Sequence, residues 1–111
     1  MAKLTRCIKL DWLEVCVLEP INEPRDPEYF QSRGIVVHQR DYGTKVWGEM
    51  FTLLDDDHLG WIEVRRAPKS DIIAPNIAHL RLTNRACYFP DAADQMQAFI
   101  DAHGYEFHHI V

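Results

Sequence analysis

Short stretches in which apolar and polar residues alternate recur along this chain, and they constrain its fold more than any other feature. In a β-strand, successive side chains point to opposite faces, so alternation with a period of two indicates a strand with one buried face. Six stretches rich in β-branched and aromatic residues fit this pattern, and turn residues separate most of them. The predicted strands are Leu10–Glu19, Gly34–Arg40, Lys45–Leu54, Trp61–Arg66, Ile77–Asn84 and Tyr105–Val111.

Helical periodicity is confined to one long stretch near the end of the chain. Over Pro90–His103, apolar residues recur every three or four positions, and Gly104 follows as a stop signal. Asp26 and Pro27 form a capping signal for one or two further helical turns before Gly34. The predicted class is α+β: a mainly antiparallel sheet of five to six strands, with one long helix (Pro90–His103) packed on one face.

Length and composition set the domain count and the expected location. A chain of 111 residues with 47% hydrophobic and 26% charged residues is typical of a single domain, here residues 1–111. No apolar run approaches the roughly 18 residues that a membrane span needs. The first nine residues contain no hydrophobic signal core, and the 3 cysteines form no disulfide motif. We therefore expect a cytoplasmic protein that does not contact membranes.

The distribution of charge suggests a binding surface. The chain carries a net charge of −5, yet Gly60–Arg85 holds five cations against Glu63 and Asp71. Alternation predicts a polar sheet face that carries Glu63, Arg65, His79, Arg81, Thr83 and Arg85. Trp61 is the expected aromatic residue of this face, with Trp47 or Tyr42 as further candidates. Guanidinium groups and aromatic rings on one flat face suit phosphates and unstacked bases. The predicted DNA contacts are Arg65, Arg81 and Arg85, with Arg66, Lys69 and Lys45 at the rim. The alternative is an ordinary solvated sheet face.

The sequence predicts no catalytic residue and no metal or cofactor site. Glu63 and His79 are a candidate ligand pair on neighbouring strands, but a cross-strand hydrogen bond explains them better. His108 and His109 are adjacent in a strand, so we expect them on opposite faces. Nothing in the local sequence selects a tyrosine as nucleophile.

Four segments, taken in order, resemble the N-terminal part of rolling-circle replication initiation proteins. They are Lys9–Val17, Val37–Lys45, Ile62–Arg66 and His79–Tyr88. The resemblance spans most of the chain and implies a DNA-facing sheet in a protein of plasmids, phages or integrative elements. Family members nick DNA with a tyrosine and a divalent metal. The family's Arg-Ile/Leu-Asp strand and the catalytic tyrosine beyond it have no counterpart here. The resemblance therefore implies a truncated initiator or the first part of a longer one, without nicking activity of its own.

Two other classes of function fit the same residues. A small protein-interaction or assembly domain could use the last strand as a sheet edge that pairs with a partner or with a second copy. A small metal-dependent enzyme built from strand-helix-strand units is the third alternative, on the basis of His79 and the helix that follows it.

Overall fold

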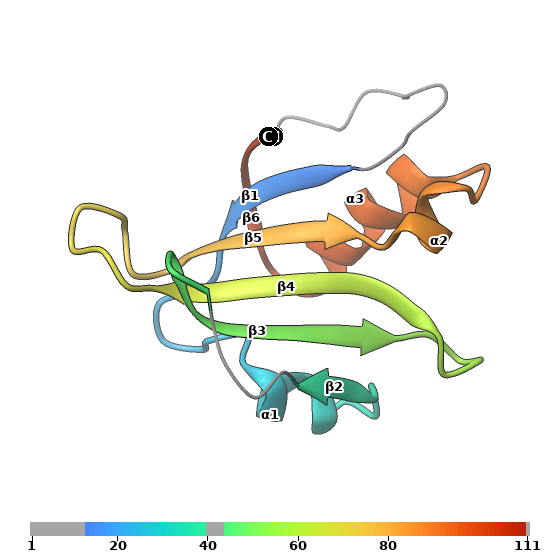
Figure 1. The fold of residues 1–111 in the computed structure, drawn as a ribbon, viewed down its shortest axis with the longest axis horizontal. Coiled ribbons are helices and arrows are strands. Elements are labelled where there is room, and N and C mark those ends of the chain that lie inside the picture. The colour runs from blue at the N-terminus through green and yellow to red at the C-terminus, as the bar shows by residue number, and fades with distance from the viewer. Residues whose placement is uncertain (1–12, 40–43, 111) are drawn as a thin grey trace.

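The fold is α+β, as predicted, and its centre is a six-stranded antiparallel sheet (Figure 1). A computed structural model describes residues 13–39 and 44–110. Each predicted strand has a counterpart in the sheet. The strands are β1 (Glu14–Leu18), β2 (Val37–Gln39), β3 (Trp47–Leu54), β4 (Gly60–Pro68), β5 (Ile77–Leu82) and β6 (Glu106–Ile110). The predicted extensions of strands into residues 10–12, Arg40 and Val111 lie outside the described residues.

The order of the strands differs from a simple meander. It is β2-β3-β4-β5-β1-β6, so only β2 to β5 follow one another as neighbours. β1 lies between β5 and β6 and is antiparallel to both. β5 and β6 therefore run parallel to each other, and a helical connection joins them across β1. This arrangement is a split β-α-β unit.

Three helices accompany the sheet: the predicted long helix, the short helix predicted before Gly34, and one further short helix that was not predicted. They are α1 (Pro27–Gln31), α2 (Asn84–Cys87) and α3 (Ala92–Ala102). The predicted capping signal is confirmed, because the Asp26 side chain accepts a hydrogen bond from the backbone N–H of Tyr29 (2.9 Å). α3 is shorter than predicted, with 11 residues. Gly104 follows it with φ +68°, a left-handed conformation that suits glycine.

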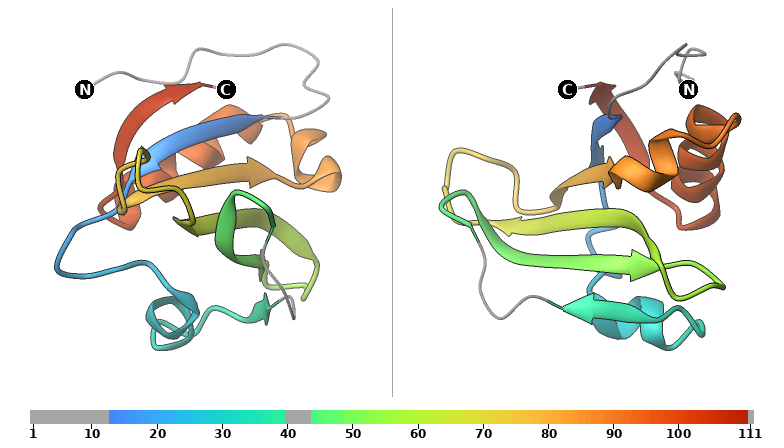
Figure 2. Two further views of the ribbon diagram at one scale, coloured as in Figure 1. Left: turned by 60° about the vertical axis from the view of Figure 1, so that its left-hand side comes forward. Right: turned by 45° about the vertical axis from the view of Figure 1, so that its right-hand side comes forward.

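The hydrophobic core lies between the helices and one face of the sheet. Phe30 of α1 stacks on Phe99 of α3, with 5.9 Å between ring centroids, and also contacts Phe51 of β3. α1 and α3 therefore share one side of the sheet, and Figure 2 shows α2 and α3 together on that side. The fully buried side chains of the strands belong to the same core: Val15, Val17, Phe51, Leu53, Ile62, Val64, Ala78, Leu80 and Leu82.

A bulge turns Trp61 toward the helices. Leu53 pairs with Ile62 while Leu54 pairs with Gly60, so Trp61 is an extra residue in β4. Because a bulge interrupts the alternation of side chains, Trp61 lies on the helix side, edge-to-face with Phe99 at 5.5 Å. The prediction that Trp61 shares the polar face with Glu63 is therefore wrong.

The lengths and composition of the helices decide whether any of them could cross a membrane. In residues 13–39 and 44–110, no helix has the length and apolar character needed to cross a bilayer.

Candidate functional site

The sheet face opposite the helices carries a row of ionisable side chains, and we call it the open face. Its members are Glu14, Cys16, Glu63, Arg65, His79 and Arg81, which alternate with the core residues of β1, β4 and β5. The register aligns them across the strands: Arg81 lies between Glu14 and Glu63, and His79 lies between Cys16 and Arg65. Directly opposed side chains in a sheet lie close enough to interact.

Carboxylates neutralise much of the positive charge that we predicted for this face. Arg81 Nε lies 3.6 Å from Glu14 Oε1, and Arg81 Nη1 lies 3.8 Å from Glu63 Oε1. The second Glu14 oxygen lies 3.4 Å from His79 Nε2. Glu63 thus faces Arg81, whereas we predicted a pair with His79. The centre of the open face is a network of opposite charges.

His79 is the half-buried centre of an aromatic and cationic group. Its ring stacks against the indole of Trp47, with 6.1 Å between centroids and 10° between planes. Arg65 Nη1 lies 3.5 Å from His79 Nδ1. Burial lowers the pKa of His79, and Arg65 lowers it further, although Glu14 opposes the shift. His79 is therefore mainly neutral near pH 7 and presents a flat aromatic surface.

Trp47 reaches the open face through an irregular end of the β3–β4 pair. Glu49 and Phe51 point to the helix side, so strict alternation would place Trp47 there as well. However, Ala67 adopts φ +56°, and Gly48 packs so closely on it that an added Cβ would lie 2.8 Å from the Ala67 carbonyl oxygen. This local twist brings Trp47 over His79. Strict alternation along β3 therefore does not predict the position of Trp47 over His79.

Arg66 lies on the helix side and not at the rim of the open face. Its Nη2 donates to Glu19 Oε1 at 2.7 Å and its Nε donates to Glu19 Oε2 at 3.2 Å, while Nη1 donates to Glu49 Oε1 at 2.8 Å. The Glu19 side chain is 3% exposed and that of Arg66 is 12% exposed. Burial acts to lower the pKa of Arg66, but the hydrogen bonds and charge of Glu19 outweigh it and the pKa is raised. Arg66 therefore stabilises the fold.

Arg85 lies on α2, beyond the end of β5, and not on the predicted strand face. Thr83 ends the strand because its hydroxyl accepts a hydrogen bond from the Ala86 N–H and caps α2. Arg85 Nη1 lies 2.7 Å from Asp55 Oδ2, and its guanidinium lies over the ring of Phe89 at 5.0 Å. Arg85 thus links α2 to the β3–β4 hairpin.

The remaining predicted cations gather at the end of the sheet where β3 begins and β4 ends, on the left in Figure 1. Lys45 and Lys69 are exposed and flank Trp47; the Lys69 N–H donates to the carbonyl of Val46 at 2.8 Å. Within the described part of the chain, Lys45, Lys69 and Arg65 form no ion pair. We call Trp47, His79, Arg65, Lys45 and Lys69 the Trp47 patch.

The histidines near the C-terminal end of the described chain depart from the predicted alternation. A shift in register between β1 and β6 leaves His108 without a partner in β1, and its Nδ1 lies 2.5 Å from Nδ1 of His109. The two rings therefore meet, although we predicted opposite faces. Among the residues that the structure describes, no group of three or more histidine, cysteine or acidic side chains is arranged to hold a metal ion.

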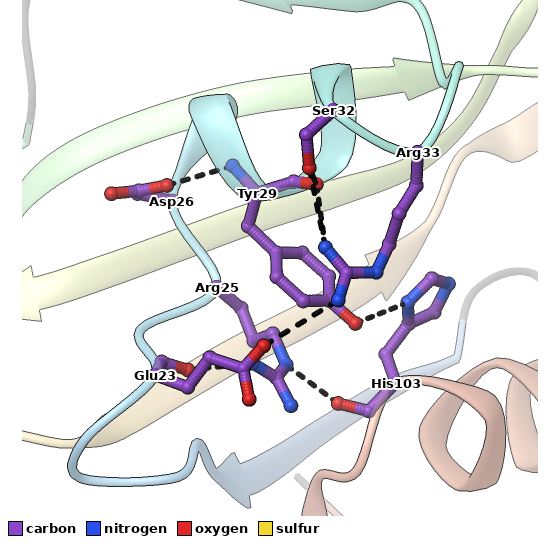
Figure 3. A network of polar contacts seen from close by, with 7 residues as sticks. All are labelled: Glu23, Arg25, Asp26, Tyr29, Ser32, Arg33 and His103. Carbon is purple, nitrogen blue, oxygen red and sulfur yellow. Dashed lines mark hydrogen bonds and ion pairs between the residues drawn. The ribbon is translucent and has the colours of Figure 1, made fainter.

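A second polar network joins α1 to the end of α3 (Figure 3). Tyr29 Oη lies 3.1 Å from His103 Nδ1, and the Tyr29 ring lies between the guanidinium groups of Arg25 (4.1 Å) and Arg33 (3.7 Å). The buried Arg25 donates to the carbonyl oxygens of His103 and Glu23, each at 2.6 Å. It thereby satisfies a helix C-terminus, where cations are favoured. Burial lowers the pKa of His103, and Arg25 and Arg33 lower it further.

Comparison of the chain with protein-family models, with curated proteins and with solved structures found no match.

Proposed function

We propose that this chain is a DNA-binding module that holds single-stranded DNA on the Trp47 patch. The observation that carries the proposal is the stack of Trp47 on His79 beside Arg65, which forms no ion pair with any described residue. Aromatic rings next to cations bind the bases and phosphates of single strands with little dependence on sequence. Of the six cations first predicted, Arg65, Lys45 and Lys69 would contact phosphates. Arg66, Arg81 and Arg85 would not, because carboxylates already engage them.

The resemblance of the sequence to rolling-circle initiators supports DNA over other polyanions, and we propose no nicking by this chain itself. We also propose a reducing, cytoplasmic setting, as expected for a sequence whose 3 cysteines form no disulfide motif. The net charge of −5 opposes nonspecific binding to DNA, so the proposed contact is confined to the patch.

Fluorescence anisotropy with a labelled oligodeoxythymidine tests this proposal. With three phosphate contacts, a plot of the logarithm of the binding constant against the logarithm of the salt concentration should have a slope of about −2. We expect Trp47→Ala to weaken binding by about 5- to 150-fold, the usual effect of losing one stacked base. Lys45→Ala and Lys69→Ala should each reduce the slope by about 0.7.

Arg85→Ala is the matched control, because it removes the same charge from a residue outside the patch. We expect it to leave the affinity within about twofold of the original protein. Circular dichroism of each variant separates lost binding from lost folding. The proposal is wrong if the original protein does not bind at about 50 mM salt, or if Trp47→Ala binds as well as the original. Tighter binding to duplex than to single strands would overturn the single-strand assignment.

Edge strand β6 supports a second candidate, a protein-interaction module. Within the described residues β6 pairs only with β1, and Ile110 is 46% exposed on it. An unpaired edge can add to the sheet of a partner or of a second copy. Light scattering that gives a stable dimer, which Ile110→Lys converts to a monomer, would favour this function. A monomer at all concentrations would count against self-association.

A further inference from the structure

A cavity of about 510 Å³ opens on the helix side of the sheet, away from the Trp47 patch. It lies where the α1–β2 connection, the β3–β4 hairpin and the α2–α3 connection meet. Its apolar lining includes Trp61, Phe89 and Leu54, and its polar lining includes Asp56, His58 and Gln95. Small-molecule sites in proteins have volumes of roughly 300–1,000 Å³ and combine apolar walls with a few polar groups.

The aromatic wall of this cavity depends on a departure from regular structure. Trp61 lines the cavity because the bulge in β4 turns it to the helix side, where its edge-to-face contact with Phe99 holds it. Phe89 supplies a second ring, and the guanidinium of Arg85 lies over this ring at 5.0 Å. Bulges often re-aim a side chain next to a functional site.

The polar side of the cavity carries uncompensated negative charge. Asp55 is fully engaged: it accepts hydrogen bonds from the N–H groups of Asp57 (2.9 Å) and Leu59 (3.1 Å), and it pairs with Arg85. Asp56 is exposed at the cavity and forms no hydrogen bond or ion pair with another described residue. One carboxylate is therefore left for a cation. Neighbouring His58, with φ +61°, and Gln95 add groups that can hydrogen-bond.

We propose that this cavity binds a small planar aromatic cation. Its ring would lie against Trp61 and Phe89, and its positive group would pair with Asp56. Aromatic rings attract cations through their negative faces, tryptophan most strongly. A ligand of the same shape with a negative charge would meet Asp56 and be rejected. This site is independent of the proposed DNA-binding function because it uses no residue of the Trp47 patch.

The test uses three probes of one shape and different charge: naphthamidine, naphthamide and naphthoate. Each is titrated into the folded protein while NMR follows the indole N–H of Trp61. We expect the amidine to bind about 2- to 5-fold more tightly than the amide, as for one exposed ion pair. The carboxylate should bind most weakly.

Two variants locate the site. Asp56→Asn should lower the affinity for the amidine to within about twofold of the affinity for the amide, and it should leave the affinity for the amide unchanged. Asp71→Asn removes an exposed carboxylate that does not line the cavity and should change neither affinity. Because Asp56 is exposed, its substitution does not threaten folding. The proposal is overturned if no probe shifts the Trp61 signal at about 5 mM, a concentration well above a dissociation constant of about 1 mM. It is also overturned if the three probes bind equally, or if Asp56→Asn leaves the preference for the amidine intact.

Discussion

Replacing Arg66 with methionine should destabilise the protein by about 3–5 kcal/mol, the usual cost of leaving one partner of a buried ion pair alone. The structure supplies the reason. Glu19 is 3% exposed and receives both of its side-chain hydrogen bonds from Arg66. Without the guanidinium, its carboxylate must stay charged in a poorly solvated site or take up a proton. The loss is a large share of the roughly 5–15 kcal/mol that holds a domain of this kind together.

Urea denaturation followed by circular dichroism measures this loss as a change in the free energy of unfolding. A double variant, Arg66→Met with Glu19→Leu, serves as the control, because it removes both charges and leaves no isolated carboxylate. We expect it to be more stable than Arg66→Met alone by about 2 kcal/mol or more. If Arg66→Met costs less than about 1 kcal/mol, within the range of exposed pairs, the structural role assigned to Arg66 is incorrect.

Three further predictions concern stability. The pKa of His103 is lowered from 6.5 on folding, so the unfolded chain takes up a proton on this residue before the folded chain does. The contribution of His103 to the unfolding free energy is therefore complete above about pH 6.5 and is lost as the pH falls toward the folded pKa. Urea titrations at several pH values should show this dependence on pH in the original protein and not in His103→Gln. Gly48→Ala places a Cβ 2.8 Å from a backbone oxygen and should lower the unfolding free energy by about 1–3 kcal/mol; an unchanged value would contradict the close contact. Phe30→Ala removes a fully buried ring between Phe51 and Phe99 and should cost about 3–5 kcal/mol by the same measurement, whereas a loss below 1 kcal/mol would place Phe30 outside the core.

The sequence predicted the elements of the fold well, because local signals determine them. Alternation located all six strands, and the Asp26–Pro27 pair located the start of α1. Helix α2 was not predicted, because Thr83 caps it and ends the preceding strand earlier than the alternation suggests. The position of β1 between β5 and β6 was also missed, since pairing of residues 59 or more positions apart leaves no local trace.

The candidate site was harder to predict, because its charges are balanced by partners distant in the chain. Arg66 follows Arg65 directly, yet it meets Glu19, 47 positions away, on the opposite side of the sheet. Arg81 lies between Glu14 and Glu63. Counting cations over Gly60–Arg85 does not show that these two carboxylates oppose Arg81, because that depends on the register of the strands. Trp47 and Trp61 both depart from strict alternation, one beside a left-handed alanine and the other at a bulge.

The position of β1 has a consequence for synthesis on the ribosome. Of the described strands, β1 is made first, yet its neighbours β5 and β6 are the last two to be made. Val15 pairs with Leu80 and Ile110, so its apolar face stays unmatched until nearly all of the described chain has emerged. Such long-range pairing slows folding and leaves a strand open to mispairing in the meantime. A nascent chain of this protein is therefore expected to need protection, by a chaperone or by its own early β2–β4 hairpins, until β6 arrives.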